Sequence, residues 1–325
     1  MKSQSLNRTL ALVGLGMGTG LLSLPDAQAS DAIDFPFDPV IGETRTYQVE
    51  KTRETHRNGT ITKNTLTMSV PITVRATDQD GLEMEVTYND IDVVGAEAGD
   101  KNTALAAGLA KLTEGFVFHY RASPTGVPIT LSNMDAVQAD LLPAVFERLD
   151  DIIAQYSSDP QIAASLAPIR QAFANMTPQA GAQMTLRDIQ PIFALTGLEM
   201  PETGVIEINN DVPWELTGSN LKAVGEIKLI DSTDEQATIE LHQNYTRESV
   251  RNGIAFLMAQ TAGMDKASME RATKQIRAWE DYDIQTDITA TLPRTGSWPQ
   301  RVDHTQTFIA AGQKQITQMT FILQD

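Results

Sequence analysis

Cysteine is absent from this chain of 325 residues. Its absence excludes disulfides, thiolate catalysis, and zinc or iron–sulfur sites built on sulfur. It also excludes a lipid anchor attached through cysteine. The fold must therefore be stabilised by packing.

Basic residues are in short supply. The chain has 25 Lys and Arg against 42 Asp and Glu, which gives a formal charge of −17. A field of this sign repels nucleic acid and anionic lipid headgroups over long range. We therefore predict no nucleic-acid partner and no phospholipid-surface partner.

Histidine and tryptophan are scarce as well. The four histidines are His56, His119, His242 and His304, and none has the spacing of a metal-binding motif. His242 follows Leu241 in a strand-like run, so we expect it on the solvated face. Three tryptophans are few for a carbohydrate-binding platform. No metal site and no cofactor is predicted.

The common catalytic and nucleotide-binding motifs are missing. Residues 14–20 are glycine-rich, but the third glycine of a dinucleotide loop would fall on Thr19. Ser219 and Lys222 have the spacing of an S-x-x-K nucleophile. Their surroundings are typical of a strand, in which this spacing sends the two side chains to opposite faces. We assign no catalytic residue to either segment.

Acidic residues gather at several points. Asp78, Asp80 and Glu83 resemble the start of a calcium loop, but Gly81 comes too early and a hairpin turn explains them better. Other clusters are Asp90 with Asp92, Asp150 with Asp151, and Glu280, Asp281 and Asp283 with Asp287. Two carboxylates at the right separation would serve a glycoside hydrolase. For residues 281–285, alternation favours the wet face of a strand.

The first 29 residues have the features of an export signal. Lys2 and Arg8 give a positively charged start, and a mostly apolar run over residues 9–24 follows. Ala27-Gln28-Ala29 then supplies a small-x-small cleavage site. The run is shorter than the roughly 20 apolar residues that span a membrane. We predict a cleaved signal peptide over 1–29, a mature chain from Ser30, and no transmembrane segment after cleavage.

Strand patterns dominate the mature chain. Asn58-Gly59 separates two strand-like runs and predicts a hairpin, and in the second run alternate residues from Leu66 to Val74 are apolar. Further runs cover 82–88, 116–121, 127–131, 221–230, 237–245, 282–292, 298–309 and 315–323. They predict antiparallel meanders with one buried face.

Helical spacing appears mainly in the middle of the chain. It predicts a helix over 132–156 bent at Pro143, a second after Asp159 kinked at Pro168, and a weaker one near 184–193. Shorter helical stretches are expected at 103–112 and within 249–280.

Two turns of similar sequence raise the question of an internal repeat. Thr125-Gly126 and Thr295-Gly296 each precede a proline inside a predicted strand pair. They indicate either a duplicated β-unit or simply the usual preference of turns for Pro, Thr and Gly. Both interpretations stay open.

These patterns predict the fold class α+β: mostly antiparallel, curved sheet with amphipathic helices packed on one face. Residues 30–41 form a lead-in segment that packs Phe35 and Phe37 onto the body. Residues 42–325 form a single α+β domain. On the duplication hypothesis its halves are 42–131 and 214–325, joined by the helical segment 132–200.

In architecture the chain resembles the exported half-barrel proteins that include bacterial lipoprotein carriers and related lipid-binding proteins. The resemblance implies an apolar cavity between sheet and helices, lined by residues such as Met68, Met84, Leu141, Val145 and Phe146. The alternative, which we favour, is that these residues form a filled core.

We expect an exported, non-catalytic protein of the cell envelope. It would be periplasmic, with an extracellular location as the alternative, and would bind an unidentified ligand, apolar or not, or an envelope protein. The alternative functions are a hydrolase that uses an acidic carboxylate pair and a purely structural or assembly role. The sequence assigns no catalytic, cofactor-binding, metal or ligand-binding residue.

Overall fold

The computed structural model describes residues 33–57, 59–94, 110–156, 173–214, 219–253, 282–310 and 312–324, together with Gly108, Arg170 and Lys274. The predicted signal peptide, the helix after Asp159 with its kink at Pro168, and the acidic residues Glu280 and Asp281 lie outside the described residues. So do most of the helical stretches expected at 103–112 and within 249–280, of which 110–112 and 249–253 are described and helical.

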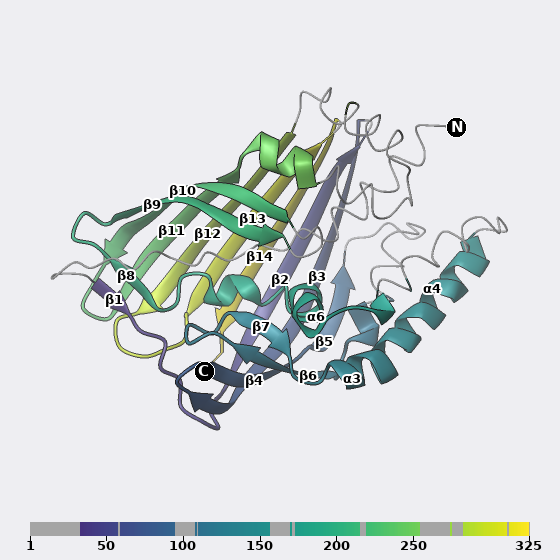
Figure 1. Ribbon diagram of the computed structural model, residues 1–325, viewed down its shortest axis with the longest axis horizontal. Coiled ribbons are helices and arrows are strands. Elements are labelled where there is room, and N and C mark those ends of the chain that lie inside the picture. Colours follow the sequence, from purple (N-terminus) through teal and green to yellow (C-terminus); the bar gives the residue numbers. More distant parts are fainter. Residues whose placement is uncertain are drawn as a thin grey trace.

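Twelve strands form one antiparallel sheet, and two short strands form another (Figure 1). The strands of the large sheet are β2 (Thr44–Arg57), β3 (Thr60–Asp78), β4 (Gly81–Thr87), β5 (Asn89–Val94), β6 (Val117–Ala122), β7 (Pro128–Leu131), β9 (Val205–Trp214), β10 (Ser219–Ser232), β11 (Gln236–Tyr245), β12 (Tyr282–Pro293), β13 (Arg301–Ala310) and β14 (Gln313–Leu323). The small sheet pairs β1 (Ile33–Phe35) with β8 (Leu198–Met200). The predicted α+β class with a curved antiparallel sheet is confirmed.

The order of strands across the large sheet is β7-β6-β4-β3-β2-β14-β13-β12-β11-β10-β9, and β5 pairs with β3 off this path. Neighbours along the chain are mostly neighbours in the sheet. β3 also pairs with β5, and β4 with β6. The long-range exception is the pairing of β2 with β14, which places Arg53 opposite Thr317 and joins the first long strand to the last. The segments 42–131 and 214–325 are therefore parts of one sheet, and their duplication stays an interpretation.

Alternation buries one face of this sheet, which we call the inner face. On β2 and β3 it carries Tyr47, Val49, Met68 and Val70, each almost fully buried, and the same pattern continues to β11. The opposite, outer face carries mainly Thr, Gln and charged residues. One face thus packs into the core and the other meets solvent, as the strand periodicity predicts.

The long central helix forms as α3 (Met134–Ala136), the π-helical turn η1 (Val137–Leu141) and α4 (Leu142–Tyr156). The irregular turn lies just before Pro143, where the bend is predicted. Proline has no N–H to donate to the preceding turn and its ring crowds the carbonyl there, so the helix widens locally. The start of α3 is tied to β6, because the Asn133 side chain accepts from the His119 N–H and donates to the Val117 carbonyl.

The prediction of a helix near 184–193 is wrong in its bounds. The helix α6 (Pro178–Thr185) begins earlier, with Thr177 as its N-cap: the Thr177 Oγ1 accepts from the Ala180 N–H at 3.2 Å. Threonine followed by proline is a helix start signal that outweighs the apolar spacing further on. Residues 190–193 form only the 3₁₀ turn η2 (Gln190–Phe193), which packs against β13.

The lead-in segment is more regular than expected, because it contains strand β1. Phe35 and Phe37 are buried as predicted. The Phe37 ring lies edge-on to Phe193 and Trp298, with centroids 5.5 and 5.3 Å apart. The two similar turns meet at this aromatic cluster. Gly126 of the first turn lies against the rings of Phe37 and Phe193, and Trp298 comes directly after Thr295-Gly296 and Ser297 of the second turn.

We expect Gly126→Ala to destabilise the fold far more than Gly59→Ala. Both glycines have positive φ, +87° and +76°, so each alanine bears backbone strain of about 1–2 kcal/mol. At Gly126 the new Cβ would also lie 2.4 Å from a Phe193 ring carbon, whereas at Gly59 nothing lies within 4 Å. Overpacking adds about 1–3 kcal/mol to the loss at Gly126. Urea denaturation of the two variants measures the difference, and equal losses would show that the aromatic cluster tolerates the methyl group.

Candidate functional site

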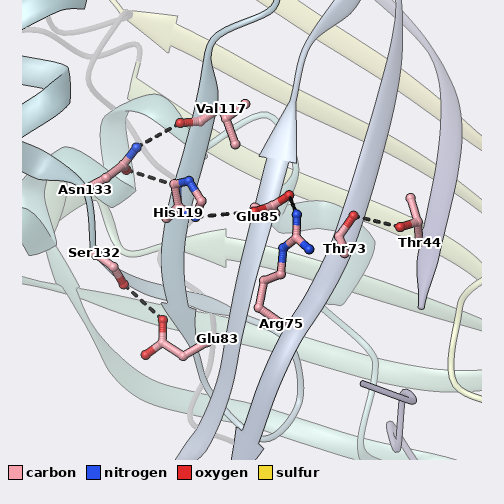
Figure 2. A network of polar contacts seen from close by, with 9 residues as sticks. All are labelled: Thr44, Thr73, Arg75, Glu83, Glu85, Val117, His119, Ser132 and Asn133. Carbon is pink, nitrogen blue, oxygen red and sulfur yellow. Dashed lines mark hydrogen bonds and ion pairs between the residues drawn. The ribbon is translucent and has the colours of Figure 1, made fainter. Parts of the chain in front are cut away.

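The outer face holds three of the four histidines in surface contacts. His242 is 45% exposed, and its Nδ1 lies 2.6 Å from Asp287 on the neighbouring strand. The predicted solvated position of His242 is confirmed. Figure 2 shows a second outer network, in which Glu85 pairs with both Arg75 and His119. Bonding to Arg75 lowers the pKa of Glu85, which keeps this surface carboxylate ionised.

Asp78 and Asp80 form a hairpin turn, as predicted. The Asp80 N–H donates to the Asp78 Oδ1 at 2.8 Å, and Arg121 pairs with Asp78 and Glu83 at 2.5 and 3.2 Å. An arginine holds these carboxylates in the position that a cation would need. Across the described residues, no group of three His, Cys, Asp or Glu side chains could hold a metal ion.

The other acidic clusters lie on different elements. Asp90 and Asp92 belong to β5 and Asp287 to β12, with β3, β2, β14 and β13 between them. Five interstrand steps correspond to an arc on the order of 20 Å, well beyond the separation of two carboxylates in a glycosidase. Asp150 lies on α4 and pairs with Arg170. Asp283 is exposed on the outer side of β12.

Ser219 and Lys222 both lie in strand β10, three residues apart. The segment is a strand, as predicted, and does not supply the helix N-terminus that the S-x-x-K chemistry requires.

The inner face contains an unexpected line of polar side chains. In an antiparallel sheet, residues directly opposite one another share a face. The registers place Arg53 opposite Thr317, Thr317 opposite Gln306, Gln306 opposite Thr286, and Thr286 opposite Gln243. We call these five residues the polar row. It crosses β2, β14, β13, β12 and β11 at right angles, on the same face as the core.

Rows on both sides of the polar row are more apolar. Toward the core lie Lys51, Met319, His304, Ile288 and Leu241, which face one another in the same way. On the other side lie Gln315, Phe308 and Ile284. Each flanking row thus mixes apolar side chains with one or two polar ones, whereas the polar row contains no apolar residue.

A charged cluster lies at the β2 end of these rows. The Lys51 Nζ is 2.5 Å from Asp188, which comes from the segment between α6 and η2, and the Arg187 Nε is 3.8 Å from the same carboxylate. Burial lowers the pKa of Lys51, and Asp188 offsets this in part. Burial would raise the pKa of Asp188, but Lys51 and Arg187 outweigh it and the pKa is lowered.

His304 is the most unusual polar residue of the inner face. It is 3% exposed, and both its ring nitrogens lack a hydrogen-bond partner within the described part of the chain. Burial lowers the pKa of His304 to about 4, so the imidazole is neutral at pH 7. The hydroxyl of Thr286, on the adjacent strand and also 3% exposed, is likewise unpartnered among the described residues. Native cores rarely leave such groups unsatisfied.

Sequence reasoning missed this site. Val302, His304 and Gln306 occupy every second position of one strand, so their side chains lie on the same face. Since valine at this position favours the buried face, His304 and Gln306 are expected on the inner face with it. That signal was available for each strand separately. The row itself depends on register, in particular on β2 pairing with β14, which the sequence does not display.

The residues proposed to line an apolar cavity belong to the hydrophobic core. Met68, Met84 and Leu141 are buried, and Val145 and Phe146 pack against them as partly buried residues. Their positions agree with the filled core that we favoured, and they are distinct from the polar row.

No described helix is long and apolar enough to cross a membrane. No protein-family model matches the chain, and no curated protein matches it in sequence. Among solved structures, one of lipovitellin, described as showing lipid–protein interactions, is similar over 88% of this chain with a TM-score of 0.43 and 7% identity. The match covers 25% of the lipovitellin chain. A likeness this weak carries no inference about what the present chain binds.

We expect His304 to make the protein less stable as the pH falls from about 6.5 to 4. The unfolded chain takes up a proton near pH 6.5, whereas the folded protein does so only near pH 4, so acid favours unfolding in that window. At pH 4.5 the cost relative to pH 7 is about 2–3 kcal/mol. In His304→Gln this contribution disappears. Urea denaturation at both pH values tests it, with the exposed His119→Gln as control; an unchanged pH dependence in His304→Gln would contradict the prediction.

Proposed function

We propose that the protein is a non-catalytic binding protein whose ligand lies on the inner face of the sheet, along the polar row. The observation that carries the proposal is the pair of unpartnered buried groups, His304 and the Thr286 hydroxyl. A buried polar group without a partner costs about 1–3 kcal/mol. A ligand that bonds to these groups supplies a reason for the protein to retain them.

The apolar side chains on both sides of the polar row favour an amphipathic ligand. Phe308 and Ile284 flank the polar row on one side and Met319 and Ile288 on the other. Gln306 in the row is only half-buried, so solvent reaches the row itself. Binding sites for small molecules typically combine apolar walls with a few convergent polar groups. The open, curved sheet also agrees with the exported half-barrel architecture that the sequence resembles.

A purely structural role accounts less well for the inner face. A sheet that only had to be stable would carry an apolar residue in place of Thr286, because replacing an unsatisfied polar group by an apolar one of the same shape is neutral or stabilising. A hydrolase is also less well supported, because the carboxylate clusters named above are spread over β5, α4 and β12.

We further propose that the protein acts outside the cytoplasm, in the periplasm. Support comes from residues 1–29, with their basic start, apolar run and Ala-x-Ala site. The absence of cysteine is compatible with that compartment, since the fold needs no disulfide there.

Thr286→Val is expected to separate stability from binding. Valine has the shape of threonine without the unpartnered hydroxyl, so the variant should gain about 1 kcal/mol in free energy of unfolding. It should also lose most of the small molecule that co-purifies with the protein from its own host cells, as measured by native mass spectrometry.

The matched control is Thr289→Val, on the outer face of the same strand. It should leave both the bound molecule and the stability close to those of the wild type. A wild-type protein that carries no ligand, together with an unstabilised Thr286→Val variant, would contradict the proposed function.

Export predicts a specific mass for the purified protein. If residues 1–29 are removed, the intact mass corresponds to a chain that starts at Ser30. Replacing Ala29 by a bulky residue, Ala29→Leu, should block cleavage and leave the longer chain with the membranes. Recovery of a full-length wild-type chain from the cytoplasmic fraction would contradict export.

A further inference from the structure

Charge is sorted between the two faces of the sheet. On β2 and on β9 to β14, every aspartate and glutamate alternates onto the outer face. These residues are Glu50, Glu54, Glu207, Asp211, Glu226, Asp231, Glu240, Asp283, Asp287 and Asp303. On the inner face of these described strands the charged residues are cations, all from β2, and Lys51 and Arg53 lie within the two central rows. An acidic chain thus presents a basic inner surface.

Arg53 is the cation best placed for a ligand. It stands at the end of the polar row, half-buried, and makes no ion pair within the described part of the chain. Its Nη2 donates to the Gln315 Oε1 at 2.5 Å, and this neutral amide does not balance its charge, which Asp188 offsets only in part. Burial and the nearby Arg187 both lower the pKa of Arg53, so the protein bears a cost for holding this charge there.

Asp188 is the carboxylate that reaches this region, and it is engaged by Lys51. The Lys51 ammonium group therefore has an ion-pair partner, while the guanidinium of Arg53 is bonded only to the neutral Gln315 amide among the described residues. A second anion beside Arg53 would balance the cluster. Guanidinium groups bind carboxylates and phosphates through paired hydrogen bonds, which suits a planar or tetrahedral oxyanion more than a neutral group.

We propose that the polar end of the ligand is an oxyanion, a carboxylate or a phosphate, bound by Arg53 at the β2 end of the polar row, with its apolar part along Phe308, Ile284 and the neighbouring apolar residues. This inference rests on the proposed function and adds the chemical class of the ligand. Gln306 and Thr286 supply hydrogen bonds to whatever polar groups adjoin the anion.

The net charge of −17 does not oppose this arrangement. Long-range repulsion acts on anionic surfaces that approach the outer face, and salt screens it within about 10 Å. An anion bound between low-dielectric walls responds mainly to the nearest charges. These are the cations Arg53, Lys51 and Arg187 and the single carboxylate of Asp188, so the local balance is positive. The sorting of charge therefore disfavours an anionic membrane surface and favours one anionic amphiphile.

The test compares three probes that share an acyl chain: palmitate, monopalmitoylglycerol phosphate and neutral monopalmitoylglycerol. Each is titrated into the delipidated protein by calorimetry at low and high salt. We expect one or both anionic probes to bind at least tenfold more tightly than the neutral one, and the preferred anion identifies carboxylate or phosphate. Arg53→Gln should weaken anion binding about 10- to 100-fold and leave the neutral probe unaffected.

Two variants control for charge and folding. Arg301→Gln makes the same change in net charge on the outer face, where Arg301 pairs with Asp303, and should not alter binding. Arg53→Lys keeps the charge without the paired donors and should give an intermediate affinity. Urea denaturation confirms that each variant is folded.

The outcomes distinguish this inference from the proposed function. Equal binding of neutral and anionic probes, unaffected by Arg53→Gln, would overturn the oxyanion site and leave the inner-face binding protein intact. Failure of all three probes to bind, with no co-purifying molecule in the wild type, would overturn both.

Discussion

Alternate residues of an antiparallel strand lie on opposite faces, and in this sheet one face is withdrawn from water. The rest of the structure depends on that constraint. Any polar residue whose position in the strand puts it on the inner face must find a hydrogen-bond partner there or remain unsatisfied. Val302 and His304 lie on the same face of β13, so the packing that buries the first also buries the second. The acidic residues of these strands lie at the outward-facing positions, and so the two faces differ in charge.

Much of the fold follows from the sequence, because strand periodicity is local. The hairpin at Gly59, the buried run from Met68 to Val74 and the π-helical turn before Pro143 all arise from neighbouring residues. Strand β9 escaped prediction because Asn209, Asn210 and Pro213 are poor strand formers. Its place at the edge of the sheet explains why such residues are tolerated. Strands β1 and β8 are too short to show a period.

The candidate site was beyond sequence reasoning for a different reason. Each member of the polar row is an ordinary residue in its own strand. Their alignment exists only when five strands are in register, and one of the pairings joins residues more than 250 positions apart, as Arg53 and Gln315 illustrate. Lys51 meets Asp188 through a segment whose helix was predicted in the wrong place. The site is a property of tertiary structure and has no motif.

The position of β14 constrains how the chain acquires its structure. The last strand of the chain lies in the interior of the sheet, between β2 and β13. Until residues 313–323 are available, the N-terminal hairpins present β2 as an exposed edge and the row of inner-face side chains stays in two pieces. Closing so long a loop is slow. The two parts of the sheet, from β7 to β2 and from β13 to β9, are joined only through β14, so the rows of inner-face side chains are continuous only when β14 is paired on both sides.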